Sequence, residues 1–277
     1  MAYKTILVHC DAGPTTPGRL AVAAELARRF GAHLVGLHVQ ARFEPATYAD
    51  AGLAADALYR AYDEKAKAAA AAAAAAFDGA AGKGLSAEWR VATGAAAEEF
   101  AVQARYADLV VLGQHDRGAP AVAPPDLPEA VAMSTGRPVL VVPYIGATTP
   151  PGRTILLCWD AKREATRAAA DAMPFLTAAE KVTVLVVDAK QSARGHGPEP
   201  GADAATWLAR HGVKVTVQRD TAADSDVGSV ILSRAADHAA DLIVMGIYGH
   251  SRLREMVLGG ASRTLLASMT VPVLMAH

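Results

Sequence analysis

The stretch RTILLCWDA, from Arg153 to Ala161, decides the fold because it repeats KTILVHCDA, from Lys4 to Ala12. Each copy is an apolar run closed by an aspartate, and the two copies lie 149 residues apart. Two further pairs recur in the same order: ADLVVLG (107–113) with ADLIVMG (240–246), and RPVLVVP (137–143) with VPVLMAH (271–277). Repeats that keep their order indicate an internal duplication of one structural unit.

The segment GATTPPG, from Gly146 to Gly152, has the composition of a linker and separates the two copies. We therefore expect two domains, at residues 1–145 and 152–277. The offset between copies falls from 149 to 133 along the chain, so the first domain is longer between its second and fourth strands. Its extra length includes a predicted helix from Asp50 to Phe77 that ends in nine consecutive alanines.

Short apolar runs alternate with amphipathic stretches in both halves. Such runs are typical of strands buried on both faces of a parallel sheet, and their alternation with helices predicts a doubly wound α/β fold. The expected strands are 5–9, 33–39, 87–91, 109–112 and 138–142 in the first half, and 153–158, 181–187, 213–219, 242–245 and 272–276 in the second; the expected helices of the second half are 162–177, 202–211, 226–238 and 254–268.

The last predicted strand of each half is an edge strand rich in valine and leucine. An exposed apolar edge promotes aggregation unless something pairs with it or covers it. We therefore expect the two halves to form an intrachain pseudo-dimer, with Val139–Val142 beside Val273–Met275; pairing between two copies of the chain is left open.

Composition excludes several classes of protein. The net charge is -1, which disfavours a general nucleic-acid binder. The longest apolar stretch, Ala68 to Phe77, is too short to span a bilayer, and no signal peptide precedes the first strand. The two cysteines, Cys10 and Cys158, have no metal-site spacing and suggest a reducing compartment. We expect a cytoplasmic protein without a membrane or nucleic-acid partner.

The segment VMGIYGHSRLREMVLGGASRTLL, from Val244 to Leu266, follows a predicted strand and leads into a predicted helix. Glycine admits a ligand close to the backbone, and the first N–H groups of a helix attract phosphate. The segment therefore predicts a phosphate-binding loop, although a tight strand-to-helix turn explains glycine equally simply. The candidate residues are Gly246, Gly249, His250, Gly259, Gly260 and Ser262, with Arg252 and Arg254 adding positive charge.

The first half keeps Gly113 but has lost most of the loop. Asp116 stands in the place of the second glycine, and prolines from Pro125 to Pro128 stand where the glycine pair belongs. Proline has no N–H to donate to a phosphate. We expect one binding site per chain, in the second half.

The spacing G-x-x-G-x9-G, between a strand ending in DLIVMG and one beginning PVLM, resembles the universal stress protein family over both halves. The resemblance implies two Rossmann-like domains, each with a five-stranded parallel sheet of order 3-2-1-4-5 between helices. It also implies binding of ATP or a related adenine nucleotide, with or without Mg²⁺. By the same resemblance Asp160 meets the ribose, Val187 meets the adenine, and Gly246, Gly249 and Gly259 hold the phosphates. Many members of the family bind such a nucleotide and others do not; Gly260 departs from the Ser or Thr that usually follows the third glycine.

No arrangement of a nucleophile with a base is visible, so we do not expect an efficient enzyme. The leading function is a stress-response or signalling protein that binds an adenine nucleotide. The alternatives are a nucleotide-free module that acts through protein partners, and a weak nucleotide hydrolase. His9, His38 and His115 follow first-half strands, so a zinc site with Asp11 or Asp116 is a minor alternative to unrelated polar residues.

Overall fold

The structure is a computed structural model that describes residues 2–42, 52–118, 122–147, 150–189, 197–223, 225–247 and 260–277, with the side chains of 52–55 excepted. The elements of the first half are β1 (Thr5–His9), α1 (Thr16–Phe30), β2 (His33–Gln40), α2 (Gly52–Ala81), β3 (Ala87–Thr93), α3 (Ala96–Gln103), the short 3₁₀ turn η1 (Ala104–Tyr106), β4 (Leu109–Gly113), α4 (Leu127–Thr135) and β5 (Val139–Val142).

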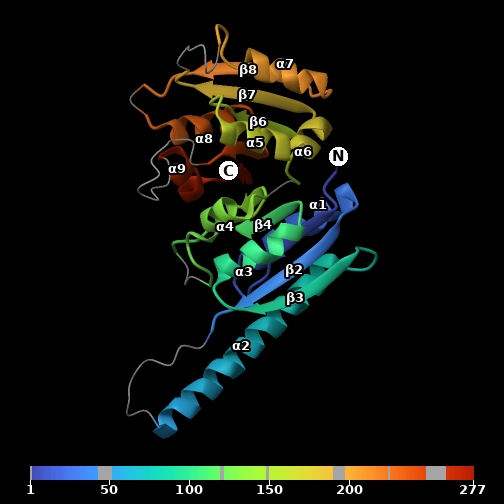
Figure 1. Ribbon diagram of the computed structural model, residues 1–277, viewed down its shortest axis with the longest axis vertical. Helices are drawn as coiled ribbons and strands as arrows, with labels where there is room; N and C mark the ends of the chain where they lie inside the picture. Colours follow the sequence, from blue (N-terminus) through green and yellow to red (C-terminus); the bar gives the residue numbers. More distant parts are fainter. Residues whose placement is uncertain are drawn as a thin grey trace.

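The second half repeats this plan (Figure 1). Its elements are β6 (Thr154–Cys158), α5 (Arg163–Asp171), α6 (Met173–Ala178), β7 (Lys181–Val187), α7 (Ala202–Arg210), β8 (Val215–Asp220), α8 (Val227–Asp237), β9 (Leu242–Gly246), α9 (Gly260–Ser268) and β10 (Val273–Ala276). All ten expected strands are confirmed within a residue or two of their predicted ends.

Within the described residues the ten strands form one sheet of order β3-β2-β1-β4-β5-β10-β9-β6-β7-β8. The strands of each half are parallel and follow the predicted order 3-2-1-4-5, mirrored in the second half. The fold class is therefore confirmed, and the two domain sheets are fused into a single mixed sheet.

The fusion occurs where β5 and β10 pair in antiparallel fashion. Val141 lies opposite Val273, Leu140 opposite Leu274, and Val139 opposite Met275, and all six side chains are fully buried. The expected pseudo-dimer is confirmed, because each exposed edge becomes a central strand of the common sheet.

Each face of the sheet has its own core. Side chains of α1, α2, α5, α6 and α7 pack on one face, around Leu26, Phe77 and Phe175. Side chains of α3, α4, α8 and α9 pack on the other, around Phe100 and Leu265. Helices therefore cover both faces of the sheet, as a doubly wound fold requires.

Two helix predictions need comment. The single helix expected over 162–177 is wrong: it breaks at Ala172 into α5 and α6, because Pro174 in the first turn of α6 lacks an N–H and its ring clashes with the preceding turn. The alanine-rich helix is confirmed as α2 and continues to Ala81, whereas residues 50 and 51 lie outside the described part. None of the described helices combines the length and the hydropathy that crossing a bilayer requires.

Candidate functional site

The direction of the connections changes at the carboxyl ends of β6 and β9. These strands are neighbours in the sheet, but β6 leads to α5 on one face and β9 leads to α9 on the other. Connections that diverge from adjacent parallel strands open a crevice in which ligands of this fold class bind. Asp160 follows β6 and Gly246 ends β9, so both residues lie at this edge of the sheet.

Asp160 lies half-exposed in the loop between β6 and α5. Its carboxylate accepts a hydrogen bond from the backbone N–H of Lys162 at 3.1 Å and lies 3.1 Å from Lys162 Nζ. The intervening Ala161 has a φ of 58°, a left-handed conformation that is uncommon for a residue with a β-carbon. The side chain of Asp160 is 50% exposed, so its oxygen atoms remain accessible to a ligand.

Val187 ends β7, next to β6, and is partly buried. The following residue, Asp188, also has positive φ, at 52°, and its carboxylate accepts a hydrogen bond from the N–H of Ala222 at 3.0 Å. Trp159 and Ala189 are partly buried apolar neighbours of these loops. The carboxyl ends of β6 and β7 thus combine partly buried apolar side chains with the carboxylates of Asp160 and Asp188.

Gly246 has a packing role of its own. A β-carbon on Gly246 would lie 2.4 Å from the carbonyl carbon of Glu164 and 2.5 Å from the backbone nitrogen of Ala165. Both atoms belong to the first turn of α5, which therefore rests directly on the end of β9. Glycine is needed at this position whether or not a ligand binds.

The remaining predicted residues lie in or beside the loop before α9. Gly249, His250 and Gly259 fall outside the described residues. Gly260 begins α9, and a β-carbon there would meet no atom of the described residues within 4 Å. Ser262 is in the first turn of the helix and is 4% exposed, so its hydroxyl is largely covered by protein.

Sequence reasoning missed two residues at this edge, Arg163 and His277. Nη2 of Arg163 lies 3.3 Å from Nε2 of His277, and Nδ1 of His277 lies 3.2 Å from the carbonyl oxygen of Ile247. A carbonyl oxygen only accepts, so Nδ1 carries the proton and Nε2 accepts from Arg163. Aligning the two copies of the repeat was the available signal, because the matching first-half residues are Pro14 and Pro143.

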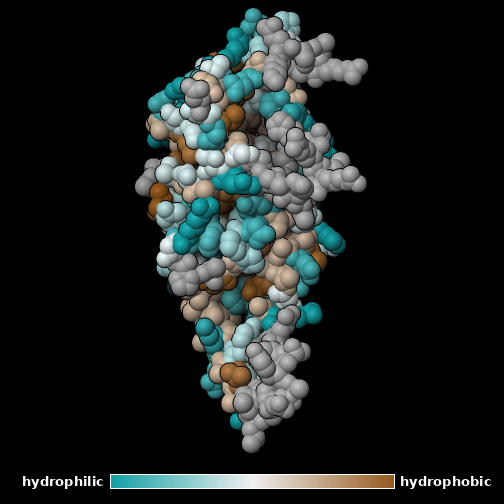
Figure 2. All heavy atoms as spheres, turned by 90° about the vertical axis from the view of Figure 1, so that its left-hand side faces the viewer, coloured by the Kyte–Doolittle hydropathy of each residue, from teal (hydrophilic) through white to brown (hydrophobic). Residues whose placement is uncertain are grey.

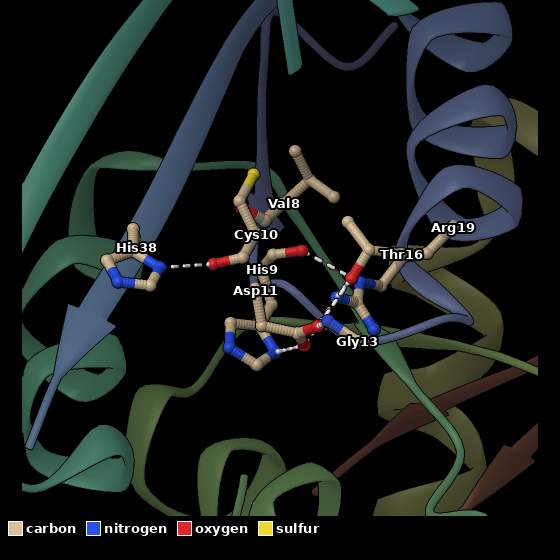
Figure 3. A network of polar contacts seen from close by, with 8 residues as sticks. All are labelled: Val8, His9, Cys10, Asp11, Gly13, Thr16, Arg19 and His38. Carbon is tan, nitrogen blue, oxygen red and sulfur yellow. Dashed lines mark hydrogen bonds and ion pairs between the residues drawn. The ribbon is translucent and has the colours of Figure 1, made fainter. Parts of the chain in front are cut away.

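The equivalent place in the first half is closed by its own side chains (Figure 3). Asp11 is 8% exposed and accepts hydrogen bonds from the N–H of Gly13 at 2.6 Å, from Oγ1 of Thr16 at 2.5 Å and from Nη2 of Arg19 at 2.8 Å. These donors use both oxygen atoms of the carboxylate. Asp11 is thus engaged within the protein, unlike its counterpart Asp160.

Arg19 fills the space beside the surviving glycine of the first half. Its side chain is buried, its Nε donates to the carbonyl oxygen of His9 at 2.7 Å, and its Nη1 lies 2.4 Å from where a β-carbon would stand on Gly113. The remaining cavity has a volume of about 60 Å³ and is lined partly by Gln114, His115 and Pro125. Arg19 thus takes up space beside Gly113 at this strand end.

The charges of this network are set by burial and by Arg19. Burial lowers the pKa of His9 to about 3, and the nearby Arg19 guanidinium acts in the same direction. Burial alone would raise the pKa of Asp11, but Arg19, His9 and the hydrogen bonds outweigh it and lower the pKa to about 2. At neutral pH this network therefore holds the Arg19–Asp11 ion pair beside a neutral imidazole.

The first-half histidines do not form one cluster. His38 donates from Nδ1 to the carbonyl oxygen of Cys10 at 2.9 Å and stacks on Trp89 with ring centroids 6.2 Å apart. His115 lines the small cavity and His9 lies 3.5 Å from Asp11. Across the described ranges no three His, Cys, Asp or Glu side chains converge as metal ligands.

Cys10 and Cys158 occupy matching positions in the two copies and are both free thiols. Burial raises the pKa of each thiol to about 12. Both remain protonated near neutral pH, so neither supplies a nucleophilic thiolate.

The fold and the crevice define a class: tandem, doubly wound α/β domains with a candidate ligand site at the carboxyl edge of one half. The universal stress protein family model matches residues 2–143 and 152–277, and the chain belongs to this family, with two such domains in tandem.

Solved structures show the same fold over the whole chain. A universal stress protein from Archaeoglobus fulgidus DSM 4304 is similar with a TM-score of 0.72 at 17% identity, covering 98% of this chain and 97% of that one. A putative universal stress protein from Pseudomonas aeruginosa UCBPP-PA14 has a TM-score of 0.58 at 17% identity, covering 99% and 93%. A functionally unknown protein, PA1789, from Pseudomonas aeruginosa PAO1 has a TM-score of 0.58 at 18% identity, covering 99% and 92%. Among curated proteins, none matches this chain in sequence.

Proposed function

We propose that the second half binds one adenine nucleotide of the ATP class per chain, without efficient turnover, and that the protein acts in a stress response or in signalling. The nucleotide occupies the crevice between β6 and β9, where Asp160 and Gly246 lie on either side. The glycine-rich loop that completes the predicted site, with Gly249, His250 and Gly259, is part of the proposal. We place this activity in the cytoplasm, consistent with two free thiols.

The observation that carries the proposal is the contrast between the two aspartates. Asp11 is buried and its oxygen atoms are occupied by three donors of its own half. The side chain of Asp160 is 50% exposed and, within the described residues, forms its hydrogen bond and ion pair with Lys162. A carboxylate that remains accessible at the end of β6 can bind ribose hydroxyls. The duplication thus supports one open site and one closed site.

Isothermal titration calorimetry with ATP, ADP and AMP, each with and without Mg²⁺, tests the proposal. We expect one nucleotide per chain. Ligand that binds only the folded state at a hundredfold excess over its Kd adds about 2.7 kcal/mol to stability, which also raises the Tm.

Two variants locate the site. Asp160→Asn should weaken binding at least several-fold, because the amide cannot accept two ribose hydrogen bonds as a carboxylate does. Glu180→Gln removes an exposed carboxylate at the start of β7, at the opposite edge of the sheet, and should bind like the parent.

The other outcomes identify the alternatives. A stoichiometry near two would show that the first half also binds. No binding at millimolar nucleotide would contradict the proposal and leave the nucleotide-free interaction module. Steady release of phosphate that disappears with Gly259→Val would instead indicate a weak hydrolase.

A further inference from the structure

The crevice of the second half is chemically different at its two ends. The sheet order places the strand ends in the series β10, β9, β6, β7. Near the β7 end, Trp159 and Val187 are partly buried apolar residues on opposite faces of the sheet, and Asp188 is exposed. The β10 end carries the cation of Arg163 and the imidazole of His277. A ligand with an aromatic ring at one end and negative charge at the other matches this polarity.

Arg163 reaches across the end of β9. It begins α5, which follows β6, yet its Nη2 meets Nε2 of His277, which follows β10. His277 in turn donates to the carbonyl oxygen of Ile247, the first residue after β9. The side chain of Arg163 is 74% exposed, and its one ion pair in the described structure, with Glu164, is long at 3.4 Å. Most of the guanidinium donors therefore face solvent.

The repeat supplies independent support. The residues that match Arg163 and His277 in the first half are Pro14 and Pro143, which carry no charge. In the first half the aspartate and the glycine position are also closed. Arg163 and His277 therefore occur in the half whose aspartate is accessible, which links them to the site proposed there.

We infer that Arg163, positioned by His277, binds the outermost phosphate groups of the nucleotide and makes the site select nucleoside triphosphates over monophosphates. The inference rests on the proposed function. Neighbouring strands lie about 4.8 Å apart, so β7 and β10 are separated by roughly 14 Å. A base at the β7 end leaves the first phosphate near the middle of the crevice, and only a longer phosphate chain reaches Arg163. One guanidinium group can donate two parallel hydrogen bonds to two oxygen atoms of the same phosphate.

Titration of Arg163→Gln with ATP and with AMP tests the inference. We expect the Kd for ATP to rise about tenfold, which corresponds to about 1.4 kcal/mol, and the Kd for AMP to change less than twofold. Arg153→Gln is the matched control, because Arg153 is 73% exposed but lies just before β6, at the far edge of the sheet. It should bind both nucleotides like the parent.

His277 is a positioning residue, and its role has a separate readout. His277→Gln can still donate to Ile247 and accept from Arg163, so it should keep the preference for ATP. His277→Leu can do neither and should lose that preference, with AMP binding unchanged. Loss of ATP and AMP binding in equal measure would indicate a structural role for His277 and overturn this part.

Failure of the proposed function and failure of the inference about Arg163 give different titration results. If the parent binds no nucleotide, the proposed function fails and the inference with it. If the parent binds ATP but Arg163→Gln weakens ATP and AMP equally, or neither, the proposed function stands and the inference is wrong.

Discussion

His9, Asp11 and Arg19 are all more than nine-tenths buried, yet they carry ionisable groups. Their burial is tolerated because Arg19 donates to Asp11, to Thr16 and to the carbonyl oxygen of His9, so that the ion pair is hydrogen-bonded throughout. The sequence could not reveal this network. The sequence indicates that the first half has lost most of its glycines. It does not indicate that Arg19, eight residues after Asp11, folds back beside Gly113.

The neutral, buried imidazole of His9 makes the protein sensitive to acid. In the folded protein His9 binds a proton only near pH 3, whereas an unfolded histidine does so near pH 6.5. Between these values the unfolded state binds more protons, so stability falls as the pH falls, by up to about 1.4 kcal/mol per pH unit. Asp11, with its pKa lowered to about 2, extends the loss below pH 4. Urea unfolding at pH 7, 6, 5 and 4 measures the slope.

Substitution separates the contribution of His9 from the rest. His9→Gln should flatten the slope between pH 6 and pH 4, even if its stability at pH 7 is lower. His211→Gln changes an exposed histidine directly after α7, and it should keep the parent's dependence of stability on pH. An unchanged slope in His9→Gln would contradict the assignment.

At the scale of elements, the first turn of α5 packs directly against the end of β9. Gly246→Ala would force a β-carbon into the backbone of Glu164 and Ala165. We expect it to lower the free energy of unfolding by about 2 kcal/mol in the absence of nucleotide. Chemical denaturation measures this loss.

Gly260→Ala is the matched control for Gly246→Ala. Gly260 begins α9, and a β-carbon there meets nothing within 4 Å in the described part of the chain. Alanine is also the better helix former, so stability should be unchanged or slightly raised. Equal losses in the two variants would show that crowding at β9 is not what Gly246 avoids.

Strands were easier to predict than helices and site residues. Apolar runs such as ILVH (6–9) and ILLC (155–158) belong to strands that are buried on both faces of the sheet. Both their continuous hydrophobicity and their repetition in the second half indicate these strands. The amphipathic pattern over 162–177 predicts one helix, because Pro174 does not interrupt the spacing of apolar residues. In the structure, proline at that point lies in the first turn of a new helix. Arg163 and His277 come together only through the strand order, which places β10 beside β9.

At the scale of the whole molecule, the antiparallel pairing of β5 with β10 makes one cooperative unit of two domains. Tyr3 donates to the carbonyl oxygen of Asp171 and packs with Phe30 and Phe175, and Gln114 donates to the carbonyl oxygen of Leu266. These contacts join the halves beyond the strand pair. We therefore expect a single thermal transition.

Charges placed at the joint should separate the halves. Val141→Lys combined with Leu274→Lys buries two ammonium groups where fully buried apolar side chains now meet. We expect the Tm to fall and calorimetry to show two transitions or a less compact protein. Val91→Lys, at a 52% exposed position on the edge strand β3, should behave like the parent. A doubly substituted protein with the parent's melting curve would contradict the role of the joint.

Because β5 and β10 run in opposite directions, the carboxyl ends of the strands on either side of the joint point away from each other. The two crevices are therefore built from separate loops. A substitution that fills one site, such as a buried arginine, therefore leaves the other site unchanged. The common sheet still requires the strands of both halves. In a duplicated chain of this architecture, one half can lose ligand binding and still be required, because its β5 strand pairs with β10 of the other half.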